Sequence, residues 1–351
     1  MSMRWLVGTY AETIADIALD AERGRLEVFR SHASEPNPSF LALHPRLPVV
    51  YAVHELRNWQ GRFGGAAGAY ALRADGALPA LGTVATHGTD PCHLAVDPSG
   101  AWLVVANYSS GHVTSLPIGP DGALGVASDV KAHAGASIDP ARQTSPHPHH
   151  VALAGGRLLI SDLGLDQIIP YRLDAAGRFV ADGLTAPGMP GGGPRRIVFH
   201  PALPCGYLLN ELHATLTRFG CDAAGELVAA ETMPMLPPGH SGRISGAEVQ
   251  IAPSGRFAYA SNRGHDSIAR FAVDPATGTL TPLGHSPSGG AEPRHFAISP
   301  CGLWLLAANQ KSDRVVLFAI DAETGALGET GQSVSVPKPV CLLHIPQERV
   351  P

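Results

Sequence analysis

Arginine, histidine and glutamate side chains recur at two adjacent positions of a phrase that the chain repeats seven times. The phrase opens with a turn proline or glycine, continues as a short apolar segment and usually ends at a second proline. The first position after the opening residue holds Ser39, Cys92, His149, Arg195, Ala247, Arg294 and Val340, and the next position holds Phe40, His93, His150, Arg196, Glu248, His295 and Cys341. Guanidinium groups bind anions, while imidazole and carboxyl groups transfer protons, so the combination suits acid–base chemistry on an anionic molecule.

The elements that must position these side chains follow from the repeat itself. Its period of about 50 residues is typical of a β-propeller blade rather than of a helical solenoid. Apolar residues alternate within the phrase, as Leu94 and Val96 do, which predicts a strand. A second apolar strand follows and, in five units, ends at a polar residue: His54, Asn107, Asn210, Asn262 and Asn309. With two further strands per unit, the sequence predicts an all-β, seven-bladed β-propeller with four antiparallel strands per blade, forming a single domain over residues 1–351.

The two ends of the chain complement each other. Residues 4–10 resemble a second strand that lacks a first, and residues 339–346 resemble a first strand that lacks a second. We therefore expect the C-terminal strand to join the N-terminal strands and close the ring, which leaves no free sheet edge. The glycine-rich segment 61–68 is expected to be a flexible surface loop inserted in the first complete blade.

Antiparallel pairing brings the end of each second strand beside the start of the first, so a third set of side chains should reach the same rim. The position after the closing polar residue holds Glu55, Tyr108, Leu163, Glu211, Arg263 and Gln310. We expect Arg195, Glu211 and Arg263 to meet at one mouth of the channel. Charges drawn into a partly desolvated funnel are costly unless they are paired, so an anionic ligand is expected there. His93, His150 and His295 share one repeat position, and bonding to a neighbouring blade is the structural alternative for them.

The segment Gln143–His150 contains His147, His149 and His150 between prolines. A metal site would need further ligands from elsewhere, so we expect no metal and interpret the segment as a rigid platform that presents His149 as an acid or base.

Composition excludes several classes of function. The net charge is −5 and no run of Lys or Arg occurs, which speaks against nucleic acid or an anionic membrane as a partner. No apolar stretch is long enough to span a membrane, and the N-terminal segment lacks the apolar run of a secretory signal, so a cytoplasmic location is expected. The five cysteines are scattered and predict neither a disulfide framework nor a zinc cage. No G-x-S-x-G elbow, dinucleotide loop or other cofactor motif occurs, and nothing here bears on oligomeric state.

Four segments together resemble a known family. Residues 143–151, 193–201 (with Asn210-Glu-Leu212), 261–268 and 292–300 are similar to the seven-bladed β-propeller lactonases, which include propeller-type 6-phosphogluconolactonases and carboxy-muconate lactonising enzymes. The resemblance implies hydrolysis of a sugar-derived lactone, such as 6-phosphogluconolactone, without a metal or cofactor. It assigns acid–base and anion-binding roles to His149, Arg195, Glu211 and Arg263, with Arg294 as a further anion contact. Where the family usually has histidine after Gly-Pro-Arg, this chain has Arg196.

These assignments form a mechanistic hypothesis. Glu211 or His149 activates water, while Arg195 and Arg263 stabilise developing negative charge. The candidate substrate-binding residues are Arg294, Arg196, His150, His295, Glu248 and Asn262. The expected partner is a small anionic lactone or carboxylate. Three alternatives stay open: cycloisomerisation of a carboxy-muconate-like dicarboxylate, a metal-dependent sugar lactonase, and a non-catalytic propeller that binds proteins.

Overall fold

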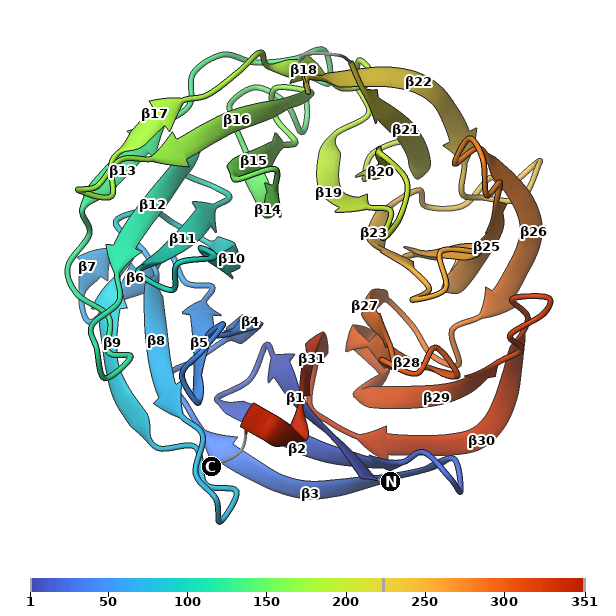
Figure 1. Ribbon diagram of the computed structural model, residues 1–351, viewed down its shortest axis with the longest axis horizontal. Helices are drawn as coiled ribbons and strands as arrows, with labels where there is room; N and C mark the ends of the chain where they lie inside the picture. Colours follow the sequence, from blue (N-terminus) through green and yellow to red (C-terminus); the bar gives the residue numbers. More distant parts are fainter. Residues whose placement is uncertain (1, 223–224, 350–351) are drawn as a thin grey trace.

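The computed structural model describes residues 2–222 and 225–349, which form seven antiparallel sheets arranged in a ring (Figure 1). This confirms the seven-bladed propeller that the repeat predicts. The innermost strands are β4 (Pro38–Leu43), β10 (Pro91–Val96), β14 (Pro148–Ala154), β19 (Pro194–Phe199), β23 (Gly246–Ile251), β27 (Pro293–Ile298) and β31 (Pro339–Ile345). The second strands are β5 (Val49–His54), β11 (Trp102–Asn107), β15 (Arg157–Asp162), β20 (Cys205–Asn210), β24 (Phe257–Asn262), β28 (Trp304–Asn309) and β1 (Ser2–Thr9).

The outer strands complete each blade. The third strands are β8 (Ala66–Ala71), β12 (His112–Pro117), β16 (Gln167–Leu173), β21 (Thr215–Cys221), β25 (Ser267–Val273), β29 (Arg314–Ile320) and β2 (Thr13–Asp20). The fourth strands are β9 (Ala80–Ala85), β13 (Asp129–Ala132), β17 (Phe179–Ala181), β22 (Leu227–Pro234), β26 (Leu280–Pro287), β30 (Leu327–Ser335) and β3 (Arg25–Ala33). A short β18 (Ala186–Pro187) also pairs with β16, and two 3₁₀ turns span Gln310–Ser312 and Gln347–Arg349. Within the described ranges, no helix is long or apolar enough to cross a membrane.

The ring closes as predicted, because β31 pairs antiparallel with β1 in the register Leu6 with Leu343 and Val7 with Leu342. One expectation was wrong. The segment 61–68 is not one flexible loop: its first part belongs to a hairpin of β6 (Asn58–Trp59) and β7 (Arg62–Phe63), and its last residues start the buried strand β8. The glycines there serve a tight turn and a close approach, since a Cβ at Gly65 would collide with the ring of Pro91.

Neighbouring blades are held together by apolar packing and by a repeated hydrogen bond. Residues of adjacent blades share buried clusters, such as Val53 of β5 with Leu94 of β10. In three blades a buried tyrosine of the second strand donates its hydroxyl proton to a glycine carbonyl in the outer turn of the next blade, at 2.6–3.0 Å: Tyr51 to Gly122, Tyr207 to Gly278 and Tyr259 to Gly325. This bond satisfies both buried groups and fixes the angle between blades.

Every blade carries a β-bulge at the same place on its innermost strand. In β10, Pro91 pairs with Asn107 and His93 with Ala106, so Cys92 is left over between them. Five other innermost strands skip one residue in the same way, and in β23 Ala247 and Glu248 lie opposite Ser261 alone. A bulge sets two residues against one and re-aims their side chains. Both positions that the repeat singled out therefore face the channel, and His149 and His150 line the same central chamber.

Deleting β31, from Pro339 onward, is expected to open the ring. It removes the buried side chains of Val340, Cys341, Leu342 and Ile345 and leaves the edge of β1 unpaired. At the usual free energy of apolar burial, the free energy of unfolding should fall by on the order of 5–10 kcal/mol. Calorimetry would show this as a large fall in Tm. A truncated chain that melts at the temperature of the full chain would contradict the role given to this pairing.

Candidate active site at the mouth of the channel

One mouth of the channel opens into a polar funnel with a volume of about 290 Å³, close to the size of a small-molecule site. Its walls come from the bulges, from the residues after the second strands and from two loops. The lining residues are Glu55, Cys92, Tyr108, Arg142, His149, Glu211, Arg243, Ile244, Ser245, Arg263 and Arg294.

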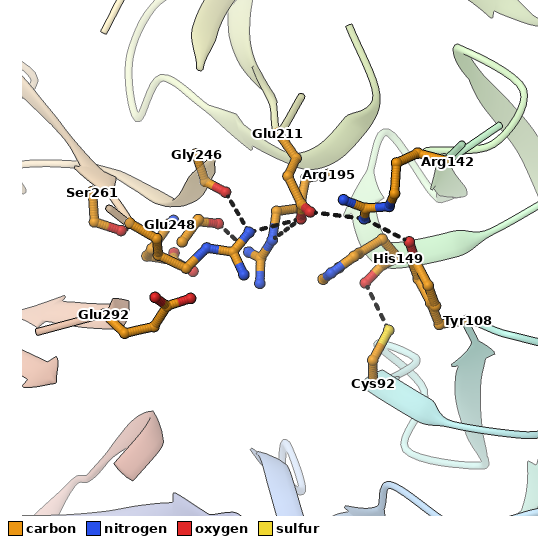
Figure 2. Close-up of polar contacts among 12 residues, drawn as sticks. Cys92, Tyr108, Arg142, His149, Arg195, Glu211, Gly246, Glu248, Ser261 and Glu292 are labelled. Carbon is orange, nitrogen blue, oxygen red and sulfur yellow. Dashed lines mark hydrogen bonds and ion pairs between the residues drawn. The ribbon is translucent and has the colours of Figure 1, made fainter. Parts of the chain in front are cut away.

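The carboxylate of Glu211 lies in the wall of this funnel between the side chains of Arg195 and Arg142, as Figure 2 shows. Its Oε2 accepts hydrogen bonds from Arg195 Nε at 3.0 Å and lies 2.9 Å from Arg263 Nη2. Its Oε1 accepts a bond from Arg142 Nη2 at 3.0 Å. Burial opposes ionisation, but the guanidinium groups of Arg263 and Arg195 outweigh it and hold the pKa of Glu211 well below its usual range. Glu211 is therefore a permanent anion, and Arg195, Glu211 and Arg263 meet as the sequence predicts.

Arg195 and Arg263 are both buried and fixed to the backbone of β23. Arg195 Nη1 donates to the carbonyl of Ala247, and Arg263 Nη2 donates to that of Gly246 at 2.8 Å. Burial and the neighbouring Arg263 lower the pKa of Arg195 to about 10, so it stays protonated at neutral pH. The pair is thus a rigid source of positive charge, with its counter-ion supplied by Glu211.

His149 lies on the bulge of β14 and points toward this group (Figure 2). Burial and the positive charge of Arg195 hold the pKa of His149 well below 6.5, so its ring is neutral at neutral pH. Its ring packs edge-on against Tyr108, with centroids 5.6 Å apart, and takes no hydrogen bond from any residue that the structure describes. A neutral imidazole without a protein partner is free to bind water or substrate.

Arg294 reaches the funnel from β27, as predicted. Its guanidinium lies over the ring of Tyr10 at 5.3 Å, and Tyr10 donates its hydroxyl proton to Glu55 Oε2 at 2.8 Å. Within residues 2–222 and 225–349, no carboxylate lies within 4 Å of its guanidinium. Burial would favour the neutral form, but Tyr10 and Glu55 raise the pKa of Arg294. Arg294 therefore offers a ligand a cation that has no direct ion pair among the described residues.

Four predicted substrate-binding residues lie below the funnel instead of in it. Arg196, Glu248, His150 and His295 line a chamber of about 20 Å³, which holds about one water molecule and excludes a sugar-sized ligand. There Arg196 Nε lies 2.6 Å from Glu248 Oε1, and His295 Nε2 lies 3.6 Å from Glu248 Oε2. Burial raises the pKa of Glu248 to about 7 despite Arg196. This inner layer plugs the channel and joins the blades.

Asn262 does not line the funnel either. Its buried side chain donates from Nδ2 to the carbonyl of Met235 at 2.8 Å and to Ser267 Oγ at 3.3 Å. The strand-closing polar residues share this internal position: Asn309 donates to the carbonyl of Ser288 and Asn107 to Thr114 Oγ1. The prediction that Asn262 contacts substrate is therefore replaced by a structural role inside the blade.

The three histidines of the segment 143–150 point to three different places. His147 stacks on Tyr108 with ring centroids 4.5 Å apart, His149 enters the funnel, and His150 packs edge-on against His93 at 4.3 Å in the inner chamber. In the part of the chain that the structure describes, no three His, Cys, Asp or Glu side chains are grouped so as to hold a metal ion.

Arg142 is a funnel residue that the sequence analysis did not select, whereas Tyr108 was expected at this rim but was given no role. Arg142 lies in the loop 133–147, which carries no repeat position and so gives no pattern to read. This loop is pinned by buried polar groups: Gln143 Nε2 donates to Asp166 Oδ1 at 2.7 Å, and Ser137 Oγ donates to Asp166 Oδ2 at 2.6 Å. The sequence signal for this loop is its length, since the distance from the second repeated phrase to the third is the longest in the chain.

Comparison with known proteins agrees with this geometry. The model of the family "Lactonase, 7-bladed beta-propeller" matches residues 4–344. The 6-phosphogluconolactonase of Bacillus subtilis is 32% identical, over 97% of this chain and 98% of its own. Two solved structures are also similar: a putative 6-phosphogluconolactonase from Bacteroides fragilis (34% identity, TM-score 0.91, 98% of both chains) and a periplasmic gluconolactonase from Pseudomonas aeruginosa (33% identity, TM-score 0.93, 99% of both chains). The chain belongs to the 7-bladed β-propeller lactonase family.

Glu211→Gln is expected to destabilise the protein in a way that added anions relieve. The change leaves three guanidinium groups without their shared counter-charge, at a cost of about 3–5 kcal/mol. Sulfate would bind among them and restore part of the loss. Thermal denaturation with and without sulfate measures both effects. Glu231→Gln is the control, because its ion pair with Arg218 lies outside the funnel; an equal response to sulfate in the two variants would contradict the central role of Glu211.

Arg195→Met is expected to raise the pKa of His149. After burial, the charge of Arg195 is the largest cause of the lowered pKa, so its removal makes protonation of the ring easier and the titration moves to higher pH. NMR titration of histidine-labelled protein measures this directly. Arg57→Met, at an exposed arginine outside the funnel, should leave the curve unchanged; an unmoved His149 titration in the Arg195 variant would contradict the assignment.

Proposed function

We propose that this chain hydrolyses a sugar-derived lactone, 6-phosphogluconolactone to 6-phosphogluconate. One observation carries the proposal: a neutral imidazole, His149, stands beside two buried guanidinium groups that a single carboxylate holds in place. Lactone hydrolysis needs these parts, namely a base for water and fixed positive charge for the oxyanion. The names of the relatives from B. subtilis and P. aeruginosa support the same reaction class.

The residues suggest the following steps. The lactone carbonyl oxygen points at Arg195 and Arg263, and the neutral ring of His149 takes a proton from a water molecule as its oxygen bonds to the carbonyl carbon. The resulting tetrahedral oxyanion is stabilised by the two guanidinium groups. When the bond between this carbon and the ring oxygen breaks, the imidazolium of His149 returns the proton to the leaving oxygen. The reaction yields the open-chain hydroxy acid and returns His149 to its neutral form.

The choice between Glu211 and His149 as the base rests on their surroundings. Both oxygens of Glu211 are occupied by guanidinium groups, which leaves the carboxylate poorly placed to take a proton from water. His149 is neutral, and its ring is not engaged by any described hydrogen-bond donor. We therefore assign water activation to His149 and the positioning of the arginines to Glu211.

A cytoplasmic location remains a prediction from the N-terminal sequence. One similar structure is described as periplasmic, so the location of this chain needs its own test. Fractionation of the producing cells, with immunodetection of the untagged chain, would decide between the two compartments.

Substitutions at His149, in the funnel, and at Arg195, which is bonded to Glu211, test the proposed reaction. With 6-phosphogluconolactone, His149→Gln should lower kcat by about 10²–10⁴-fold, and Arg195→Met by about 10²–10³-fold. Acid release followed in a pH-stat measures turnover, and circular dichroism checks the fold of each variant. Arg57→Met serves as the control of unchanged activity. If the wild-type protein converted a carboxy-muconate dicarboxylate and left the lactone untouched, the proposed function would be wrong.

A further inference from the structure

Arg142 differs from the other arginines around Glu211 in how it is held. Arg195 and Arg263 are about 5–7% exposed and fixed to backbone carbonyls, whereas the Arg142 side chain is 43% exposed. Its guanidinium is held only by side chains: Nη2 donates to Glu211 Oε1 at 3.0 Å and to the Tyr108 hydroxyl at 2.9 Å. Its Nε and Nη1 donate to no residue that the structure describes. The guanidinium of Arg142, which lines the funnel, therefore keeps donors that no described residue satisfies.

Tyr108 adds a third donor at the same place. Its hydroxyl oxygen accepts the bond from Arg142, which leaves its own proton without an acceptor among the described residues. Burial raises the pKa of Tyr108, so the hydroxyl stays protonated. Its ring is stacked on His147, whose Nδ1 hydrogen-bonds the Tyr108 carbonyl at 2.9 Å. The stacking of the Tyr108 ring on His147 thus fixes the position of the hydroxyl.

The loop that carries Arg142 is built to hold its position. Buried Gln143, the next residue, is clamped by the carbonyl of Leu163 at 2.8 Å and by Asp166. Gly164 allows the loop to approach closely, because a Cβ there would collide with the carbonyl oxygen of Ser145. Ordering a long loop costs conformational entropy. If Arg142 served only to cover Glu211, this many anchoring contacts in its loop would not be needed.

The charge around Glu211 exceeds what the carboxylate can neutralise. Three guanidinium groups share one carboxylate, which leaves a surplus of two positive charges. In the proposed reaction, the buried pair serves the oxyanion. The outer guanidinium remains for a second anionic group on the same ligand, and arginine suits a phosphate because it can donate two parallel bonds.

We propose that Arg142 and Tyr108 form a subsite for a phosphate monoester carried by the lactone substrate away from its reacting carbonyl. This inference rests on the proposed function and assigns within it the group that distinguishes a phosphorylated from an unphosphorylated sugar lactone. Arg142 then exchanges its contact with Glu211 for the phosphate when substrate binds.

Two substrates that differ only in the phosphate test the proposal. Arg142→Met should raise KM for 6-phosphogluconolactone by about 10–100-fold more than it raises KM for glucono-δ-lactone, the selective loss expected for a charge-assisted contact to the phosphate. Tyr108→Phe should act in the same direction but more weakly, and Arg142→Lys should recover part of the affinity. Arg57→Met, which removes one exposed positive charge, is the control for a general electrostatic effect.

The outcomes separate the possible roles. If Arg142→Met weakened both substrates equally through kcat, Arg142 would only position Glu211 and the proposal would be overturned; unchanged kinetics for both would overturn it too. Calorimetric binding of 6-phosphogluconate against gluconate provides a readout that needs no turnover. If wild-type protein hydrolyses neither lactone, the proposed function fails, and the subsite survives only if the wild type prefers 6-phosphogluconate and the Arg142 variant does not.

Discussion

The charged part of this structure depends on the ion pairs of one buried carboxylate. Glu211 touches Arg195, Arg263 and Arg142, which come from β19, from the turn after β24 and from the loop 133–147. Guanidinium groups brought this close repel each other, and each loses hydration in the funnel wall. The shared carboxylate allows the three guanidinium groups to lie close together but does not cancel their total charge. The net positive charge that remains is available to an anionic ligand and to an oxyanion.

The same charge determines the protonation state of the neighbouring histidine. Because Arg195 stands close to His149, the imidazole stays neutral well below the pH at which a free histidine is charged. A neutral ring beside fixed cations can accept a proton while the cations stabilise the negative charge formed in the same step. The division of labour between a positioning carboxylate and a reacting imidazole thus follows from their contacts, since the arginines occupy both oxygens of the carboxylate and leave the imidazole ring unengaged.

The bulge on each innermost strand explains why a propeller can carry a two-layered channel. An unbroken strand would alternate its side chains between the two faces of the blade. The extra residue turns two successive side chains toward the axis, so that the first can reach the funnel, as Cys92, His149 and Arg294 do, while the second lies deeper. His149 and His150 show the result, since both line the inner chamber and only His149 also reaches the funnel. Arg195 and Arg196 are divided in a similar way, the first bonded to Glu211 and the second to Glu248.

The amino-acid sequence by itself determined the architecture and the meeting of Arg195, Glu211 and Arg263, because a repeat with strand periodicity fixes which residues occupy equivalent places in every blade. Only the tertiary structure decided how deep each side chain lies. The bulges, which no residue pattern marks, sent Arg196, Glu248, His150 and His295 below the funnel, and an internal hydrogen bond turned Asn262 into the blade. Only the fold, likewise, brought Arg142 to Glu211, since a loop outside the repeat is positioned by distant buried partners such as Asp166 and not by its own sequence.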